Sequence, residues 1–141
     1  MVEETQPSVK DVIAIAEFRS ALRHFLRRSE KVARQSGLTP QRYTLLMMIK
    51  GAPGGDEQST VTELAERLQL AQSTVTELVR RAETAGLIER EQSQRDARVA
   101  HLRLTSEGER RLMLSFTALE TERAQLREAF ANLDGGVAGT S

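Results

Sequence analysis

The chain has 141 residues, with 20 basic and 20 acidic side chains, two histidines and no cysteine. This length supports one compact domain or two small ones, and it excludes large enzymes built on a cofactor domain. Without cysteine there are no disulfides or thiolate metal sites, and two histidines alone do not predict a metal centre, so we expect no cofactor and no metal. No apolar run is long enough to span a membrane and the first residues lack the pattern of a signal peptide, which predicts a cytoplasmic protein without a membrane partner.

The first predicted element is a long helix. Apolar residues at steps of three and four predict a helix over residues 9–35, with Ser8 as its N-cap and Gly37 as its stop. Basic residues gather at positions 19–42, against a single acid. This cluster is compatible with a solvated helix face, a contact with DNA or the binding of an anionic small molecule.

A short second helix and a connector follow. Thr39 and Pro40 have the residue types of an N-cap and a first helical position, and Gly51 ends the helix that they begin. The next segment, residues 51–59, is rich in glycine, proline and polar residues. Such a composition predicts a flexible polar loop.

Two short helices with a tight turn are predicted next. Thr60 and Glu63 have the spacing of a capping box, and the helix that they begin stops at residues 69–70. Another helix follows at once over residues 72–85 and ends at Gly86. Apolar residues occupy the positions at which the two helices of a helix-turn-helix face inward, and these residues are Leu64, Leu68, Leu70, Val75 and Leu78.

The last part of the chain predicts a hairpin, a helix and a tail. Strands at residues 87–90 and 99–104 flank a polar, basic tip, which is the pattern of a β-hairpin. A single helix is predicted over residues 107–133, and residues 134–141 predict a flexible tail. The helix has a 3.5-residue seam, which seeks a partner helix and consists of Leu112, Phe116, Leu119, Arg123, Leu126, Phe130 and Leu133.

These segments together resemble the winged helix-turn-helix of the MarR family of bacterial transcriptional regulators. The resemblance is carried by TVTELAERLQLAQSTVTELVRRAETAGLIER at residues 60–90 and by RDARVAHLRLTSEG at residues 95–108, which holds an Asp-x-Arg wing pattern at positions 96–98. The flanking helices also match, so the resemblance covers nearly the whole chain. The sequence departs from the family at Gln69, where glycine is usual in the turn, and at Ala71, where a capping serine is common.

The resemblance implies a mostly α-helical protein with a small β wing. It implies N-terminal helices at residues 1–50 for dimerisation and an effector cleft, a DNA-binding lobe at residues 60–108 and a C-terminal dimerisation helix at residues 109–133. Such a homodimer would bind a pseudo-palindromic operator in double-stranded DNA. It would repress transcription until a small phenolic or aromatic effector, which can be anionic, releases the DNA.

Candidate binding residues follow from the faces of the predicted elements and from the resemblance. Residues 60–104 hold seven basic and seven acidic side chains, so DNA affinity depends on where the arginines lie. Glutamine can pair with adenine, glutamate can accept from cytosine, and wing arginines suit a narrow minor groove. By resemblance, Asp96 holds the shape of the wing tip and Arg98 is the preferred DNA contact.

The predicted DNA-binding residues are Gln72, Ser73, Thr74, Thr76, Glu77, Arg80, Arg95, Asp96 and Arg98. The predicted effector-binding residues are Phe18, Leu22, His24, Phe25, Arg28, Tyr43, Met47 and Met48.

Other interpretations stay open at this point. The recognition residues could be plain polar surface, Arg98 could only pair with Asp96, and the effector set could be ordinary core. No G-x-S-x-G, P-loop or H-E-x-x-H motif occurs, so we do not expect an enzyme. The alternative function is a winged-helix module that binds protein without specific DNA binding, because the lobe has no net charge. The basic wing and the polar recognition helix favour DNA.

Overall fold

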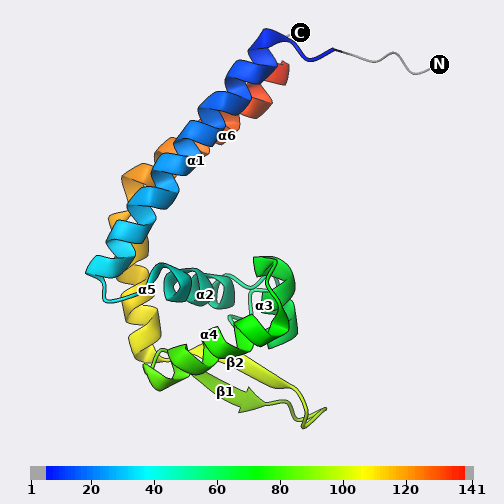
Figure 1. The fold of residues 1–141 in the computed structure, drawn as a ribbon, viewed down its shortest axis with the longest axis vertical. Coiled ribbons are helices and arrows are strands. Elements are labelled where there is room, and N and C mark those ends of the chain that lie inside the picture. The colour runs from blue at the N-terminus through cyan, green and yellow to red at the C-terminus, as the bar shows by residue number, and fades with distance from the viewer. Residues whose placement is uncertain (1–5, 139–141) are drawn as a thin grey trace, which may run out of the picture. The chain divides into compact units, whose positions relative to one another are not determined.

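The computed structural model describes residues 6–138, with side chains described through Leu133, as six helices and a two-stranded sheet (Figure 1). The predicted mostly helical fold with a small β wing is confirmed. Contacts divide the chain into two compact units, residues 1–31 with 118–141 and residues 32–117. No helix within the described residues is long and apolar enough to cross a membrane. The division of the chain by function at residues 1–50, 60–108 and 109–133 stays a prediction.

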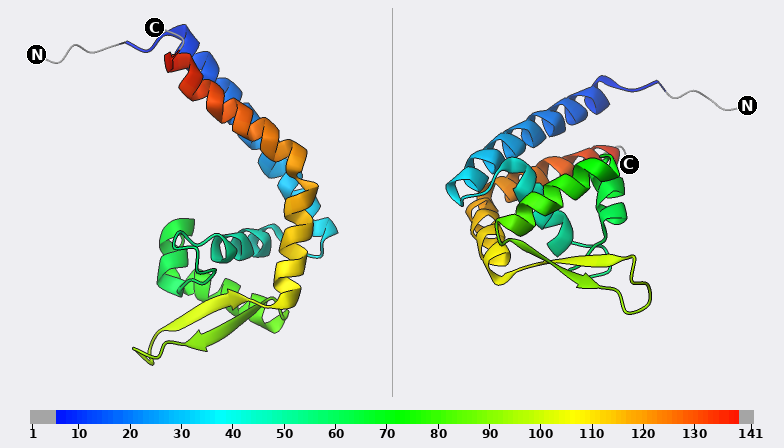
Figure 2. Two further views of the ribbon diagram at one scale, coloured as in Figure 1. Left: turned by 180° about the vertical axis from the view of Figure 1, so that it is seen from behind. Right: turned by 60° about the horizontal axis from the view of Figure 1, so that its bottom comes forward.

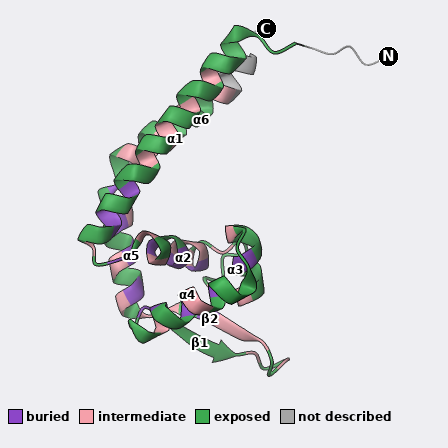
Figure 3. Cartoon of the chain, viewed as in Figure 1, coloured by how far each residue is buried: buried purple, intermediate pink, exposed green. Residues whose placement is uncertain are grey.

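The first unit is an antiparallel pair of helices, α1 (Val9–Gln35) and α6 (Glu120–Ala138) (Figure 2). The expected cap of α1 is confirmed, because the backbone NH of Asp11 donates to Ser8 Oγ at 3.2 Å. The rings of Phe18 and Phe130 pack edge to face, with their centroids 6.0 Å apart. Helix α1 is exposed along most of its length (Figure 3). The large apolar residues that are exposed in this unit are Val9, Val12, Ile13, Ile15, Leu26 and Phe130.

The predicted continuous helix over residues 107–133 is wrong. The chain instead forms α5 (Ser106–Ala118) and α6, with a break at Leu119. Leu119 is fully buried, and its carbonyl accepts from the backbone NH of Arg123 at 2.8 Å, which starts the new helix. The sequence could not reveal this break, because the residues of the seam keep their steps of three and four on both sides of Leu119.

The predicted tail also differs from the structure. Helix α6 continues to Ala138, whereas a flexible tail was expected from residue 134. Two adjacent glycines suggested an end to the helix, but each glycine costs a helix only about 1 kcal/mol and no proline follows them. The rest of the predicted tail, residues 139–141, lies outside the described residues.

The second unit holds α2 (Pro40–Lys50), α3 (Val61–Leu68), α4 (Gln72–Thr84), β1 (Ile88–Gln92), β2 (Ala100–Leu104) and most of α5. Both predicted caps are confirmed, because Thr39 Oγ1 accepts from the backbone NH of Arg42 and Thr60 and Glu63 form a reciprocal capping box. Helix α2 packs on α3, α4 and β2. The core that these elements share includes Leu45, Leu46, Ile49, Leu64, Val75, Val79, Leu87 and Leu102.

The turn between α3 and α4 is built on a left-handed residue. Gln69 has φ 56° and ψ 45°, so the strain expected from its replacement of glycine is present. Its side chain offsets part of that strain by donating to the Glu66 carbonyl at 2.7 Å. The expected inward position of Leu70 is wrong, because Leu70 is 42% exposed. Its backbone NH closes the end of α3 on the Ala65 carbonyl at 3.1 Å, so backbone bonding fixes its position in the turn.

The wing is a two-stranded hairpin, and a backbone bridge from the connector, which the sequence did not predict, joins its second strand. Strands β1 and β2 pair antiparallel, with Ile88 opposite Leu104, and β1 continues to Gln92, two residues beyond the predicted end. Ser59, from the connector, bridges to Leu102 through backbone hydrogen bonds of 3.1 and 2.8 Å. The connector is therefore attached to the middle of strand β2.

Candidate nucleic-acid interface

Helix α4 buries one face and exposes the opposite one. Val75, Val79 and Ala82 are buried against the core. The predicted recognition residues lie on the other side of the helix, with Glu77 half-buried and the rest exposed, and these exposed residues are Gln72, Ser73, Thr74, Thr76 and Arg80. This separation of apolar and polar side chains places the polar ones on a surface that is free to meet a ligand.

The N-terminus of α4 has no side-chain cap. Its N-cap, Ala71, makes no side-chain hydrogen bond, so the absence of the usual serine leaves the helix without a cap. Gln72 does not replace the cap, because its Nε2 donates to Thr62 Oγ1 on α3 at 3.3 Å. The first amide groups of the helix and its positive dipole end therefore remain available to an anion.

Glu77 joins two arginines on α4. Its Oε1 accepts from Arg80 Nη2 at 2.6 Å and from Arg81 Nε at 3.1 Å, while its Oε2 accepts from Arg80 Nε at 3.0 Å. The hydrogen bond from Arg80, with that from Arg81, lowers the pKa of Glu77 to about 2. Arg81 was not among the predicted site residues. The spacing Glu-x-x-Arg-Arg could have identified it, since positions i+3 and i+4 face position i on a helix.

The wing tip is held by hydrogen bonds that backbone NH groups donate to side-chain oxygens. Ser93 Oγ accepts from the backbone NH groups of Arg95 and Asp96, at 3.2 and 3.3 Å. Asp96 Oδ1 accepts from both the backbone NH and the Nε of Arg98, at 3.0 and 3.1 Å. These bonds from Arg98 lower the pKa of Asp96. The Arg98 side chain is nevertheless 91% exposed, so the ion pair orients it without covering it.

Most arginines of the winged helix already have protein partners. Arg67 donates to the carbonyls of Met48 and Gly51, and Arg90 makes a bidentate pair with Glu83. Arg103 lies 3.6 Å from Glu91. Among the described residues, Arg95 is the arginine of the segment 60–104 whose guanidinium has no hydrogen bond or ion pair. Most guanidinium groups of this segment are therefore already bound to protein acceptors, and Arg95 is the exception among the described residues.

The predicted effector residues fall into both units. Phe18, Leu22, His24, Phe25 and Arg28 lie on α1 in the first unit. Tyr43, Met47 and Met48 lie on α2 in the second unit, where Tyr43 is buried.

Within the first unit, two pockets gather part of the predicted effector set. One, of about 310 Å³, is lined by His24, Phe25 and Arg28 together with Glu122 and Gln125, two residues that sequence reasoning missed. The other, of about 340 Å³, is lined by Phe18 and Phe25 on α1 and by residues of α6. The Arg28 Nε lies 3.9 Å from Glu122 Oε1, while the buried Oε2 of Glu122 has no partner among the described residues.

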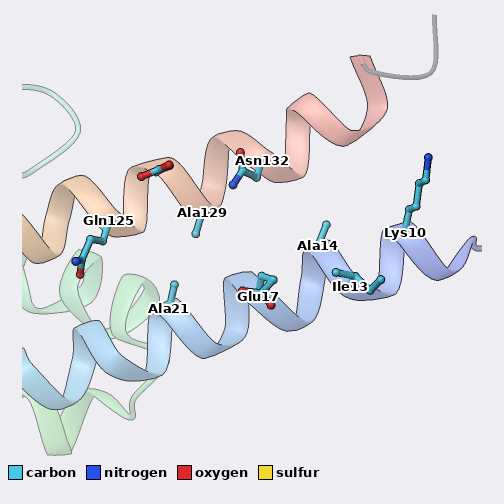
Figure 4. A pocket seen from close by; sticks show the side chains of 9 residues that line it. Lys10, Ile13, Ala14, Glu17, Ala21, Gln125, Ala129 and Asn132 are labelled. Carbon is cyan, nitrogen blue, oxygen red and sulfur yellow. The ribbon is translucent and has the colours of Figure 1, made fainter.

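A third pocket lies farther along the same helix pair. It measures about 430 Å³ and is lined mainly by small or apolar side chains of α1 and by α6 (Figure 4). Ala14, Ala21 and Ala129 face it, with Lys10 at one end and Gln125 at the other. The pocket continues the exposed apolar surface of α1, because Ile13 is one of its lining residues.

Comparison with known proteins agrees with this geometry. Residues 36–99 match the family model described as MarR family. A mutant MarR from E. coli complexed with operator DNA is 17% identical, with a TM-score of 0.67 over 86% of this chain and 89% of that one. A mutant MepR from S. aureus bound to an oligodeoxyribonucleotide is 20% identical, with a TM-score of 0.66 over 88% and 95%. AbsC, a MarR family transcriptional regulator from Streptomyces coelicolor, is 22% identical, with a TM-score of 0.61 over 92% and 84%. No curated protein matches the sequence.

Proposed function

We propose that this protein, whose residues 36–99 match the model of the MarR family, is a sequence-specific DNA-binding transcriptional regulator that acts as a homodimer. The observation that carries the proposal is the exposed polar face of α4 with its uncapped N-terminus, in the same compact unit as a wing that exposes Arg98. A regulator of this kind meets its DNA in the cytoplasm and needs no catalytic group, cofactor or metal. The solved complexes of MarR with operator DNA and of MepR with an oligodeoxyribonucleotide support the same assignment.

Helix α4 would enter the major groove. Gln72, Ser73 and Thr76 have the donors and acceptors that distinguish base edges, and Gln72 can pair with adenine through two hydrogen bonds. A backbone phosphate would occupy the open N-terminus of α4 and accept from its first amide groups. Ser73 and Thr74 carry hydroxyl groups at that end of the helix and could donate to the same phosphate.

The wing would follow the adjacent minor groove. A narrow minor groove has a strong negative potential, which favours an inserted guanidinium. Arg98 is oriented by Asp96 and stays exposed, and Arg95 carries a guanidinium without a partner in the described structure. We therefore assign both arginines to DNA contacts and Asp96 to the shape of the tip.

A second copy of the chain would cover the apolar surface of the first unit. Six large apolar residues of this unit, all on α1 except one on α6, are between 51% and 75% exposed. Soluble monomers rarely expose contiguous apolar surface of this kind, and two helices per copy could form a helical interface. Two recognition helices in such a dimer would read half-sites about 34–36 Å apart.

The protein would act as a repressor, and a small effector that binds to the first unit would release it from DNA. The pocket lined by His24, Phe25 and Arg28 combines an aromatic wall with a cationic group, which suits a small aromatic anion. Its occupant would change how the dimer presents its two winged helices. Isothermal titration with benzoate and with phenol tests this, and Arg28→Gln should abolish only the binding of benzoate.

The function is tested by fluorescence anisotropy with two duplexes of equal length. One carries the DNA upstream of the protein's own gene and the other is its scrambled version, each titrated at 50 and 200 mM salt. We expect tight binding to the first duplex only. Equal and weak binding to both would refute the proposal and favour the alternative, a winged helix that binds a protein partner.

A further inference from the structure

The acceptor sites of Glu77 are mostly taken in the free protein. Its carboxylate accepts three hydrogen bonds from Arg80 and Arg81, all between 2.6 and 3.1 Å. An ionised carboxylate offers about four such positions. Glu77 therefore has little capacity left for the cytosine contact that the sequence suggested, and its role on the recognition helix needs another explanation.

The same hydrogen bonds restrict the two arginines. A guanidinium held in a bidentate pair presents fewer free N–H groups to a phosphate, and the neighbouring negative charge repels that phosphate. Both arginines are more than half exposed, so these ion pairs are weak and a well-placed phosphate can displace the carboxylate. The pairing is thus a competition whose outcome depends on how closely the helix sits on the DNA.

We propose that Glu77 is an internal counter-ion of the recognition helix, which withholds Arg80 and Arg81 from the phosphates of arbitrary DNA and so contributes to sequence discrimination. This inference rests on the proposed DNA-binding function. On a random duplex, the helix lacks base contacts that hold it close, and Glu77 keeps the arginines. On the operator, base contacts fix the helix in the groove, and phosphates at short range take over one or both guanidinium groups.

The chain contains a matched control for this arrangement. Glu107 on α5 accepts from Arg110 at 2.6 and 3.0 Å and from Arg111 at 2.8 Å, with the same Glu-x-x-Arg-Arg spacing. It is about as exposed as Glu77, and its pKa is likewise lowered to about 2 by Arg110 and Arg111. Glu107→Gln therefore changes the net charge as Glu77→Gln does, but away from the recognition helix.

The experiment measures binding of the full-length protein and of the Glu77→Gln, Glu77→Ala and Glu107→Gln variants by anisotropy. The probes are a duplex that the wild-type protein selects from a random pool and a scrambled version of it, each titrated from 50 to 200 mM salt. Circular dichroism verifies that every variant is folded. For Glu77→Gln, we expect random-duplex binding to become more salt-dependent, since each additional phosphate contact adds about 0.9 to the slope of log K against log salt.

One or two additional contacts correspond to an extra loss of about 3.5-fold to 12-fold in random-duplex affinity across this fourfold change in salt. The affinity for the selected duplex should change less, so its ratio to the random affinity falls in both Glu77 variants and not in Glu107→Gln. Unchanged slopes in the Glu77 variants would overturn the inference. Loss of selected-duplex binding with unchanged random binding would overturn it too and assign Glu77 to base reading.

The same measurements distinguish a failure of the DNA-binding function from a failure of the counter-ion role. If the wild-type protein selects no sequence from the pool and binds DNA without salt dependence, the proposed DNA-binding role fails before any variant is compared. If the wild-type protein selects a sequence and the Glu77 and Glu107 variants behave alike, only the counter-ion role is refuted.

Discussion

Gly108 lies directly against the backbone of Leu87: a β-carbon placed on Gly108 would stand 2.1 Å from the Leu87 carbonyl oxygen. This approach joins the start of α5 to the start of the wing. Thr105 strengthens the join, because its backbone NH donates to the Leu87 carbonyl at 3.0 Å and its Oγ1 donates to the Gly86 carbonyl at 2.6 Å. The same Oγ1 accepts from the backbone NH of Gly108 at 3.1 Å.

Gly108→Ala should therefore destabilise the protein by at least about 2 kcal/mol, because the backbone must move to admit the new methyl group. Urea unfolding followed by circular dichroism measures the change. Gly54→Ala is the control, since its β-carbon would meet only the Asp56 carboxylate, at 3.7 Å, and its stability should stay within about 0.5 kcal/mol of wild type. Similar losses in the two variants would contradict the role of close contact at Gly108.

Because Gln69 has a left-handed conformation, glycine at this position should stabilise the protein more than alanine does. Gln69→Ala and Gln69→Gly both lose the hydrogen bond to the Glu66 carbonyl, but only glycine relieves the backbone strain at φ 56°. The glycine variant should be more stable than the alanine variant by about 1 kcal/mol, opposite to the usual order in a helix. Equal thermal unfolding midpoints for the two variants would show that the turn relaxes without cost.

Acid should weaken the ion pairs of Glu107. Its pKa in the folded protein is about 2, below the ordinary value of 4.5, because Arg110 and Arg111 donate to its carboxylate. The stabilisation is complete above the ordinary value and disappears as the pH falls from about 4.5 towards 2. The midpoint of thermal unfolding should fall less between pH 5 and pH 2.5 in Glu107→Gln than in the wild-type protein.

The control for this pH dependence is Glu66→Gln, because Glu66 is exposed and its carboxylate makes no hydrogen bond or ion pair within the described residues. Its acid sensitivity should match that of the wild type. Salt at 1 M should reduce the difference between Glu107→Gln and the wild type, because both partners are in contact with solvent. Identical acid sensitivity of all three proteins would refute the prediction.

The wing arginines and Gln72 should differ in their effect on DNA binding. Arg95→Ala and Arg98→Ala should each reduce the slope of log K against log salt by about 0.9 on both selected and random duplexes, because each removes a positive charge that would release a counterion from the DNA. Gln72→Ala should change the preferred base at one position and leave the slope unchanged. Anisotropy measures both, with Arg127→Ala as the control on an exposed arginine of α6 that lies outside the basic cluster at residues 19–42. Equal effects of all three changes on selected and random DNA would contradict these roles.

The exposed apolar residues of α1 should hold the dimer together. Val12→Asp and Ile13→Asp place a charge on side chains that are 60% and 55% exposed, so the fold of one copy is retained while its association is lost. Light scattering coupled to size exclusion should show a monomer for these variants and a dimer for wild type. Ser20→Asp, at an exposed polar position of α1, should remain a dimer. A dimer that survives both substitutions would place the interface elsewhere.

Local signals accounted for most of the helices. Ser8, Thr39 and Thr60 cap helices as expected, because a cap depends on atoms within a few residues along the chain. The ends of helices at Gly37 and Gly86 were also correct, since both residues have positive φ. The wing was located by its alternating pattern and its polar tip, with its first strand two residues longer than expected.

Contacts between distant residues were not visible in the sequence. The backbone bridge of Ser59 to Leu102 and the exposure of Leu70 depend on where other elements lie. The break at Leu119 lies beside the boundary between the two units, where the apolar repeat continues in phase. The distribution of the predicted effector residues over both units had no local signal either.

The sequence by itself determined most of the elements, the winged helix and the polar face of α4, because helix caps, turn residues and apolar periodicity act over a few residues of the chain. Only the tertiary structure decided which charges remain available for DNA. Arg67 is taken by carbonyls of α2 and its following loop, whereas Arg95 is left without a partner among the described residues. Pairing of charges depends on distances of a few ångströms between side chains, and composition alone gives only their sum.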